Sequence, residues 1–257
     1  MIKQLNGARI LVTRPAHQAE NLSRLIQEHG GEAIRFPVLD IVARDNIGEV
    51  RNTLKNLEKF QWVVFISANA VNFALKANDG KIDRLKTVRF AVVGQATARA
   101  LETAGMAVDV VPEQGYTSEA LLAMPQMQQV KGQACLIVRG EGGREELANI
   151  LRGRGAEVQY LEVYKRTIPS IDKSQVVQLL VQRRLDVITV TSGEALRNLL
   201  IMLGEENHQL LLPIPLVVVS DRIRQLAAEM GFKRITVTEN PADTEILETV
   251  TIVCNGE

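Results

Sequence analysis

Short runs of valine, isoleucine and leucine alternate along the chain with longer segments in which apolar residues recur at helical spacing. Continuous apolar runs of this length are typical of strands buried on both faces of a parallel sheet, and their alternation with helices predicts an α/β fold. The predicted strands are Arg9–Thr13, Trp62–Ile66, Phe90–Val93, Val108–Val111, Ala134–Val138, Asp186–Val190, Leu216–Val219 and Ile235–Thr238.

The second half of the chain repeats the first. An ungapped offset of 125 residues places the segment from Gly7 to Glu32 on the segment from Gly132 to Glu157, with Arg14 on Arg139. In both segments an amphipathic stretch precedes a glycine. In the first copy Leu22, Leu25 and Ile26 share one helical face, and in the second copy Leu147, Ile150 and Leu151 do the same. The same offset carries Ser67 onto Ser192, and an offset of 126 carries residues 92–105 onto 218–231. The chain therefore contains two copies of one α/β unit, each of ordinary domain size.

Two domain arrangements are compatible with this repeat. The copies could fold separately as residues 1–128 and 130–257. Alternatively, the extended segments 32–45 and 157–169 could pair and cross, so that each copy donates its first strand and helix to the other. The residues alone leave both arrangements open.

Composition narrows the class of protein. Apolar residues make up 46% of the chain and aromatic residues only 4%, so the core is expected to be mainly aliphatic. The 30 basic residues balance the 30 acidic ones, and this balance argues against nucleic acid or an anionic membrane as partner. No segment resembles a signal peptide or a membrane span, which predicts a cytoplasmic protein. The two cysteines and three scattered histidines form no pattern with metal-ligand spacing, so neither a metal nor a cofactor is expected.

Polar residues follow the predicted strands in both copies, where an open parallel sheet presents side chains and helix N-termini to ligands. Taken one at a time, the serines are ordinary helix caps. Taken together, they predict a rim that binds an anionic or polar ligand. The residues expected to bind are Arg14, Ser67, Asn69, Gly94, Gln95, Thr97, Arg139, Gly140, Thr191, Ser192, Gly193 and Ser220.

Three other features of the sequence give weaker evidence of function than these strand-end residues. The run RGEGGRE at 139–145 lacks the third glycine of a dinucleotide fingerprint and the Gly-Lys-Ser/Thr of a P-loop, so a tight turn with exposed amides is the better interpretation. Glu141, Glu145 and Glu146 are interpreted as first-turn residues favoured by the helix dipole. Tyr164 lies in the second extended segment, where it is either a packed amphipathic side chain or a functional hydroxyl.

In several stretches the chain resembles the uroporphyrinogen-III synthase family of bacterial haem biosynthesis. These stretches are ILVTRP, HGGEAIRFPVLDI, FISANAV, AVVGQATARAL, LIVRGEGGREELANILRGRGAEVQYLEVYKR, VITVTSGEALRNLL and LVVVSDRIRQLAAEMGF. They extend from about Arg9 to Leu247, and their order and spacing are more specific than any single motif.

The resemblance implies a fold and a reaction. The fold is two α/β domains, residues 1–37 with 167–257 and residues 41–163, joined by antiparallel connectors near 36–43 and 161–169, with the active site in the cleft between the domains. The reaction is a cofactor-free loss of water from hydroxymethylbilane, a linear tetrapyrrole with eight carboxylates. The last pyrrole ring is inverted as the macrocycle closes to uroporphyrinogen III. A monomer with this small-molecule substrate is expected.

The resemblance also assigns roles to residues. Tyr164 matches the family's connector tyrosine, the proposed hydrogen-bond donor to the leaving hydroxyl, while Ser67, Thr97 and Ser192 match polar cleft positions. Asn69 departs from members that carry a basic residue there, and the run from Ser220 to Ile223 departs from members with Gly-x-Thr-Thr. These departures put side-chain contacts at those two places in doubt.

Three alternatives stay open at this stage. Arg14 and Arg139 are either carboxylate-binding residues or structural arginines that bond loop carbonyls and nearby carboxylates. A catalytically inactive relative could bind a tetrapyrrole without closing it. A two-lobed small-molecule sensor would share the architecture, although 257 residues leave no room for the DNA-binding or membrane-tethered appendage that such a sensor needs.

Overall fold

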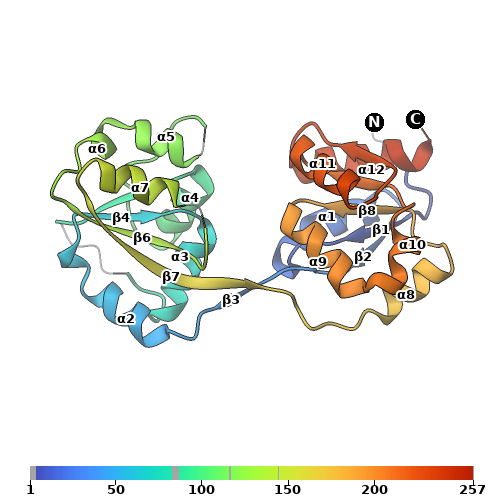
Figure 1. Cartoon of the computed structure of the whole chain (residues 1–257), viewed down its shortest axis with the longest axis horizontal. Helices are drawn as coiled ribbons and strands as arrows, with labels where there is room; N and C mark the ends of the chain where they lie inside the picture. The colour runs from blue at the N-terminus through green and yellow to red at the C-terminus, as the bar shows by residue number, and fades with distance from the viewer. Residues whose placement is uncertain (1–3, 83–86, 116, 144, 257) are drawn as a thin grey trace. The chain divides into compact units, whose positions relative to one another are not determined.

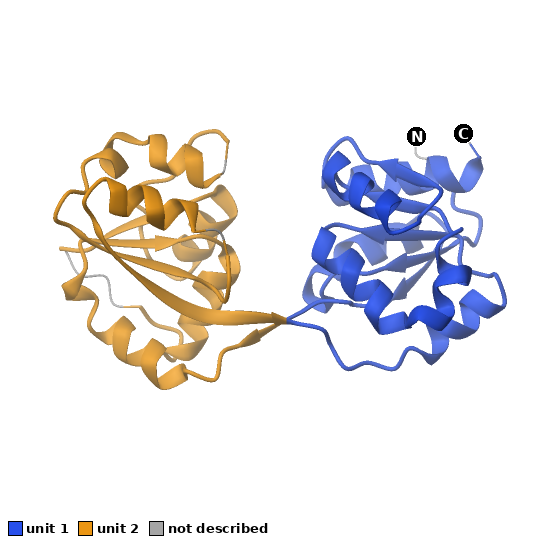
Figure 2. Cartoon of the chain, viewed as in Figure 1, with its two compact units in different colours: residues 1–40, 167–257 blue, residues 41–166 orange. Residues whose placement is uncertain are grey.

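The computed structural model describes residues 4–82, 87–115, 117–143 and 145–256. The chain divides into two compact units, which Figure 2 distinguishes by colour: unit 1 contains Met1–Asp40 and Thr167–Glu257, and unit 2 contains Ile41–Arg166. The chain thus passes from unit 1 to unit 2 and back again.

Unit 1 is built on a sheet of strand order β10-β9-β8-β1-β2, in which every described pair is parallel. Helices α1 and α12 pack on one face of this sheet, and α8, α9 and α11 pack on the other. Figure 1 labels these helices and the strands β1, β2 and β8. The elements of unit 1 are β1 (Arg9–Val12), α1 (Ala16–Glu28), β2 (Glu32–Arg35), α8 (Ser174–Val181), β8 (Val187–Val190), α9 (Gly193–Leu203), α10 (His208–Leu211), β9 (Leu216–Val218), α11 (Asp221–Glu229), β10 (Ile235–Val237) and α12 (Asp243–Asn255).

Unit 2 has a sheet of order β3-β7-β6-β4-β5. Helices α2, α3 and α4 cover one face, and α5, α6 and α7 cover the other. Its elements are β3 (Asp40–Ala43), α2 (Ile47–Lys55), β4 (Trp62–Phe65), α3 (Ala68–Ala77), β5 (Arg89–Val92), α4 (Gln95–Thr103), α5 (Ser118–Ala123), α6 (Pro125–Gln128), β6 (Ala134–Gly140), α7 (Glu146–Gly153) and β7 (Glu157–Thr167).

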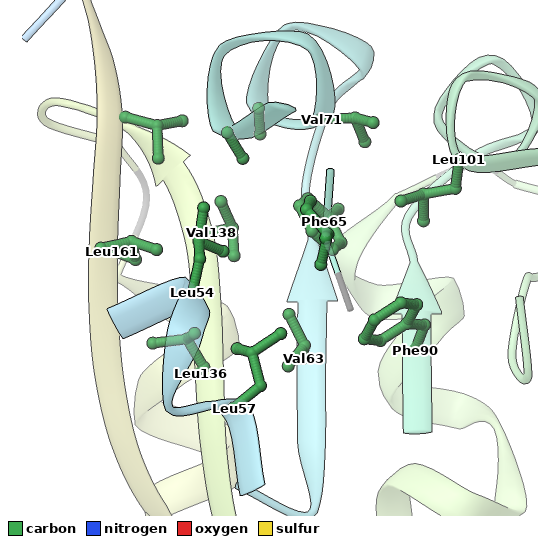
Figure 3. Close-up of a cluster of buried hydrophobic side chains, with 14 of the residues drawn as sticks. Leu54, Leu57, Val63, Phe65, Val71, Phe90, Leu101, Leu136, Val138 and Leu161 are labelled. Atoms are coloured by element: carbon green, nitrogen blue, oxygen red, sulfur yellow. The ribbon is translucent and has the colours of Figure 1, made fainter. Parts of the chain in front are cut away.

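The apolar runs form strands because both faces of each sheet are covered. All four residues of β4 are buried, and alternate residues point into different clusters, as the two-residue period of a strand requires. Val63 and Phe65 lie in the cluster drawn in Figure 3, whereas Trp62 and Val64 lie in the cluster on the opposite face. The parallel α/β character predicted from the apolar runs is confirmed.

The repeat is visible in the topology. Strands β1 and β8 of unit 1 are neighbours, and so are the equivalent strands β6 and β4 of unit 2. Helices α1 and α7 both end before glycines with positive φ, 79° at Gly30 and 86° at Gly155, a backbone conformation that side chains with a Cβ avoid. Equal local sequence has therefore given equal strands and helix ends in the two units.

One predicted strand is wrong. The segment Val108–Val111 forms only an isolated parallel bridge, from Val110 to Ala91, where unit 1 has the full strand β10. The carboxylate of Asp109 accepts the backbone N–H of Phe90 at 2.7 Å, so a side chain occupies a ladder position that a backbone carbonyl would otherwise fill.

The extended segments are ordered as strands. Segment 157–169 contains β7, an 11-residue strand, and segment 32–45 contains β2 and β3. Strand β3 lies beside β7, and Arg44 donates its N–H to the carbonyl of Val163 at 3.4 Å.

Candidate functional site

Tyr164 lies at the carboxyl end of the unit 2 sheet. It belongs to β7 and pairs with Gly140 of β6 after a register shift between Arg139 and Gly140. Its side chain is only 3% exposed, and its ring packs against Phe73 at 5.6 Å between centroids. Its hydroxyl oxygen lies 3.3 Å from Oγ of Ser67.

Ser67 has two roles in this geometry. It is the N-cap of α3, where its Oγ accepts the N–H of Ala70 at 3.1 Å. That hydrogen bond uses a lone pair of the oxygen and leaves the serine proton free. If this proton is donated to Tyr164, the phenolic proton of the tyrosine is available to a ligand.

Gly140 provides the space that the tyrosine ring needs. A Cβ at this position would lie 2.4 Å from Cε2 and 2.5 Å from Cζ of Tyr164. Real Cβ atoms do not approach other atoms so closely, so the residue at this position of β6 controls where the ring lies.

Arg139 is buried at the same strand end and is paired with carboxylates. Its Nη1 lies 3.1 Å from Oε1 of Glu145, and its Nε lies 3.4 Å from Oε1 of Glu162. The guanidinium also stacks over the ring of Tyr160 at 4.1 Å. Within the described part of the chain, Nε is buried without a hydrogen-bond partner of good geometry.

Glu145 and Tyr160 complete this cluster. Tyr160 donates its hydroxyl proton to Oε2 of Glu145. This hydrogen bond, together with Arg139, holds the pKa of the Glu145 carboxyl below its ordinary value, while burial and the same carboxylate raise the pKa of Tyr160. Of the three glutamates interpreted as first-turn residues, Glu146 begins α7 and Glu145 is its N-cap, with a carboxylate that bonds to side chains of neighbouring strands. Glu141 directly follows β6 and lies outside the helix, so the interpretation is wrong for that residue.

A pocket of about 400 Å³ opens beside these residues. Arg139, Gly140 and Tyr164 line it, so the structure brings three of the predicted site residues together. Ser67 joins them through its contact with Tyr164. The remaining lining residues are Ile66, Val93, Thr117, Ser118, Glu119, Ile137, Gly142, Gly143, Leu147, Tyr160 and Arg166.

The other predicted residues of unit 2 stand near this pocket without lining it. Ile66 and Val93 line the pocket, and each directly precedes a predicted residue, Ser67 and Gly94. Gly94 is the N-cap of α4, Gln95 is exposed in its first turn, Thr97 is 4% exposed, and Asn69 is half-buried in α3.

The predicted residues of unit 1 follow β1, β8 and β9. Arg14 pairs with Asp243 at the start of α12 and donates to the carbonyl of Pro241 at 3.1 Å. This is the geometry of a structural arginine, and it shows that both arginines carry intradomain carboxylate partners. Ser192 caps α9 by accepting the N–H of Ala195 at 3.0 Å, and Ser220 caps α11 with a longer bond of 3.4 Å.

Thr191 and Gly193 flank the first of these caps, and both are half-buried. A Cβ on Gly193 would approach Cδ2 of Leu226 to 2.9 Å, so the start of α9 packs closely on α11. The polar edge of unit 1 thus consists of helix starts with capped amides.

Sequence reasoning missed Tyr160, Glu162 and Arg166. The sequence does carry a signal for two of them, because Tyr160 and Glu162 alternate with the buried Leu161 and Val163 along β7. Their pairing with Arg139 depends on the register of β6 against β7, and the sequence does not give that register.

Two kinds of site are not found in the described residues. No group of three or more histidine, cysteine, aspartate or glutamate side chains in ranges 4–82, 87–115, 117–143 and 145–256 is arranged to hold a metal ion. Over the same ranges, no helix has the length and apolar character to cross a membrane.

The chain is similar to curated proteins over nearly its full length. It is 34% identical over 242 residues to the uroporphyrinogen-III synthase of Escherichia coli K12, an alignment that covers 93% of this chain and 97% of that protein. The enzyme of Salmonella typhimurium LT2 is also 34% identical, with the same coverage of each chain.

Solved structures share the fold. The mutant uroporphyrinogen III synthase of Thermus thermophilus superposes with a TM-score of 0.66 at 19% identity, covering 98% of this chain and 100% of that one. The enzyme of Helicobacter pylori 26695 superposes with a TM-score of 0.58 at 14% identity, covering 94% and 97%. Residues 20–248 match the family model described as uroporphyrinogen-III synthase HemD. The chain therefore belongs to the uroporphyrinogen-III synthase family.

Proposed function

We propose that this chain is a uroporphyrinogen-III synthase, a hydro-lyase that converts hydroxymethylbilane into uroporphyrinogen III. The observation that carries the proposal is the match to enzymes of this name over 93% of the chain and 97% of the relative. The pocket of unit 2 supports it, because a tyrosine hydroxyl and a buried guanidinium line one hollow.

The bonds of this reaction break and form readily, so the protein needs to give little chemical assistance. The pyrrole nitrogen expels the hydroxyl group as water, and the azafulvene that results closes unaided to the wrong isomer. The enzyme must hold the last ring so that its substituted carbon attacks and a spiro intermediate forms, which is a positioning task with modest acid assistance.

We assign the acid assistance to Tyr164. The Ser67 hydroxyl is 3.3 Å from the phenol oxygen and can donate to it, which leaves the phenolic proton directed at a ligand and stabilises charge that develops on the oxygen.

We assign carboxylate binding to the two polar sheet edges. In unit 2, Arg139 lines the pocket together with the turn at Gly142 and Gly143. In unit 1, the starts of α9 and α11 at Ser192 and Ser220 offer helix N-termini, and Arg14 lies after β1. A polyanion can therefore be bound by a chain of zero net charge.

The experiment is a product assay. Purified protein is supplied with hydroxymethylbilane, and the type I and type III isomers are resolved by chromatography. Type III product in excess of type I is expected. Formation of type I alone at the uncatalysed rate would assign the chain to the second candidate, a relative that binds tetrapyrroles without closing them.

We further propose that the enzyme acts as a monomer in the cytoplasm, in keeping with a small-molecule reaction. Light scattering during size-exclusion chromatography tests the monomer, with a mass of 28.4 kDa expected.

A further inference from the structure

A second pocket, of about 530 Å³, lies in unit 1 at the edge opposite to the predicted binding residues. Its lining residues Asp186, Pro215 and Arg234 directly precede strands β8, β9 and β10, so it opens at the amino ends of the strands. We call it the amino-edge pocket. It is lined by Leu180, Arg183, Leu185, Asp186, Gln209, Leu210, Pro213, Ile214, Pro215, Arg234, Val253 and Cys254.

The lining of the amino-edge pocket contains more positive than negative side chains. Arg183 and Arg234 are exposed, and neither guanidinium has a hydrogen bond or ion pair to any residue that the structure describes. The carboxylate among the lining residues, Asp186, already accepts the backbone N–H of Arg9 at 2.7 Å through Oδ2. The lining of the pocket thus combines two guanidinium groups without a described partner, those of Arg183 and Arg234, with apolar side chains.

Arg183 occupies a backbone position that disfavours it. It follows helix α8 with φ of 51°, and its N–H donates to Leu180 while that of Arg184 donates to Leu179, the pattern of a helix end that normally uses glycine. At the C-terminal end of α1, the residue with positive φ is a glycine, Gly30. An arginine in the left-handed region costs stability, and such strain is concentrated where a side chain has another task.

The repeat shows that these arginines are not a shared feature of the fold. The offsets of the two copies place Glu58 on Arg183 and Val108 on Arg234. At the matching edge of unit 2, the equivalent of Pro215 is Arg89, whose guanidinium stacks over Trp62 at 4.0 Å and donates to Gln133 at 3.2 Å. The guanidinium of Arg89 therefore has partners within unit 2, whereas those of Arg183 and Arg234 have none among the described residues.

We propose that the amino-edge pocket binds a small organic anion whose carboxylate or phosphate group is held by Arg183 and Arg234. Its apolar body would lie against Leu180, Leu185 and Ile214, and the volume falls within the range of about 300–1,000 Å³ typical of small-molecule sites. Guanidinium groups suit this head group because they donate two parallel hydrogen bonds to a carboxylate or phosphate. The site is independent of the proposed ring closure.

The test uses the full chain and 8-anilinonaphthalene-1-sulfonate, an anion with an apolar body, in a fluorescence titration. Saturable binding at one site is expected, with about tenfold weaker affinity in Arg183→Gln and in Arg234→Gln, since each loses charge-assisted hydrogen bonds. The matched control is Arg184→Gln, which removes the same charge from the next residue and does not line the pocket. Unsaturable binding, or an equal loss in all three variants, overturns the proposal.

Competition identifies the head group. Displacement of the probe by octanoate, but not by inorganic phosphate, assigns a carboxylate ligand, and the reverse result assigns a phosphate. Displacement by neither anion overturns the proposal. Octanoate should also slow alkylation of Cys254, which lines the pocket, and leave alkylation of Cys135 in unit 2 unchanged.

A second variant separates binding from folding. Arg183→Gly relieves the backbone strain, so it should raise the Tm of unit 1 while it weakens probe binding about tenfold. A rise in Tm with unchanged affinity would return Arg183 to a purely structural role and overturn the proposal. Arg183→Gln should leave type III product formation unchanged, so failure of this site and failure of the proposed enzyme are distinguishable.

Discussion

Gly140 and Tyr164 pair across strands β6 and β7 so closely that a methyl group on Gly140 would lie 2.4 Å from the tyrosine ring. The ring also packs against Phe73, and its hydroxyl lies beside Ser67. The absence of a side chain at Gly140 therefore determines where the Tyr164 hydroxyl lies. That hydroxyl is the group that we propose as proton donor to the leaving hydroxyl of the substrate.

Gly140→Ala is expected to lower type III turnover and the free energy of unfolding together. The added methyl group forces the Tyr164 ring or the strand to shift, and overpacking of this kind costs about 1–3 kcal/mol. Chemical denaturation and the product assay measure the two effects.

The control is Gly143→Ala, in the turn that follows β6. Its new Cβ would meet nothing closer than Cζ of Arg139 at 3.7 Å, an ordinary contact, so both properties should stay near those of the parent. Equal behaviour of the two alanine variants would contradict the assigned role of Gly140.

Tyr164→Phe is expected to keep the fold and lower kcat for type III product. Acid assistance is worth about 10²–10⁴-fold, and the low end is expected here because the hydroxyl departs readily. Tyr160→Phe is the matched control, since it removes another phenol from the same pocket, one that is bonded to Glu145. An unchanged kcat in the Tyr164 variant would leave that residue with a packing role only.

Most strands and the repeat could be predicted from the sequence. The strands appear as short apolar runs, and the repeat appears as segments that match at a fixed offset. Apolar runs gave β1, β4, β5, β6, β8, β9 and β10 to within a residue or two. The segment at Val108–Val111 has the same pattern and still fails to form a strand, because one side chain, Asp109, takes a ladder hydrogen bond. Whether a polar side chain competes with the backbone depends on a partner strand that the local pattern does not contain.

The site was predictable only in part. Arg139, Gly140 and Tyr164 do line one pocket, since all three lie at the carboxyl edge of parallel strands. The carboxylate partners of Arg14 and Arg139 were not predictable. Asp243 is 229 residues from Arg14, and the contact between Arg139 and Glu162 depends on strand register.

Arg139→Ala is expected to raise KM about tenfold with a smaller effect on kcat, and to weaken the salt dependence of KM. The physical reason is that Arg139 brings a positive charge to the lining of the pocket, where it can bind a carboxylate of the substrate. Arg152→Ala is the control, because Arg152 also approaches the Tyr160 ring, at 5.4 Å, but does not line the pocket. Earlier melting with an unchanged KM would make Arg139 a scaffold residue.

The equivalent arginine of unit 1 provides the comparison for Arg139. Arg14→Ala should raise KM less, because Arg139 lines the pocket of unit 2, whereas the guanidinium of Arg14 is held by Asp243 and the carbonyl of Pro241. If Arg14 acts only through Asp243, then Arg14→Ala and Asp243→Asn should lose similar amounts of stability and share the KM of the parent. A rise in KM confined to Arg14→Ala supports substrate binding by this residue.

Both thiols should react slowly with alkylating reagents in the folded protein at mildly alkaline pH, compared with the unfolded chain. Burial raises the pKa of Cys135 and of Cys254 to about 11 from an ordinary value of 9.0. At pH 9 only ~1% of each folded thiol is then ionised, against about half in the unfolded chain. Because the folded pKa is raised, the stabilising contribution is fully present below pH 9 and is lost as the pH rises towards 11. Alkylation rates with and without urea at pH 9 measure the difference, and equal rates would show that the thiols are accessible.

Ser67→Ala and Ser192→Ala are each expected to lower the free energy of unfolding through the loss of a helix cap. The two serines are equivalent in the repeat and cap α3 and α9 through bonds of 3.1 and 3.0 Å, and removal of such a cap costs about 1 kcal/mol. Their kinetic effects should differ, because only Ser67 has its hydroxyl against that of a tyrosine. Ser67→Ala should lower kcat in the manner of Tyr164→Phe, and the double variant should be no slower than Tyr164→Phe alone, since both changes interrupt one donor chain. Ser192→Ala, which leaves that chain intact, should change KM rather than kcat. Additive losses in kcat for Ser67 and Tyr164 would show that the serine acts on the substrate independently of the tyrosine.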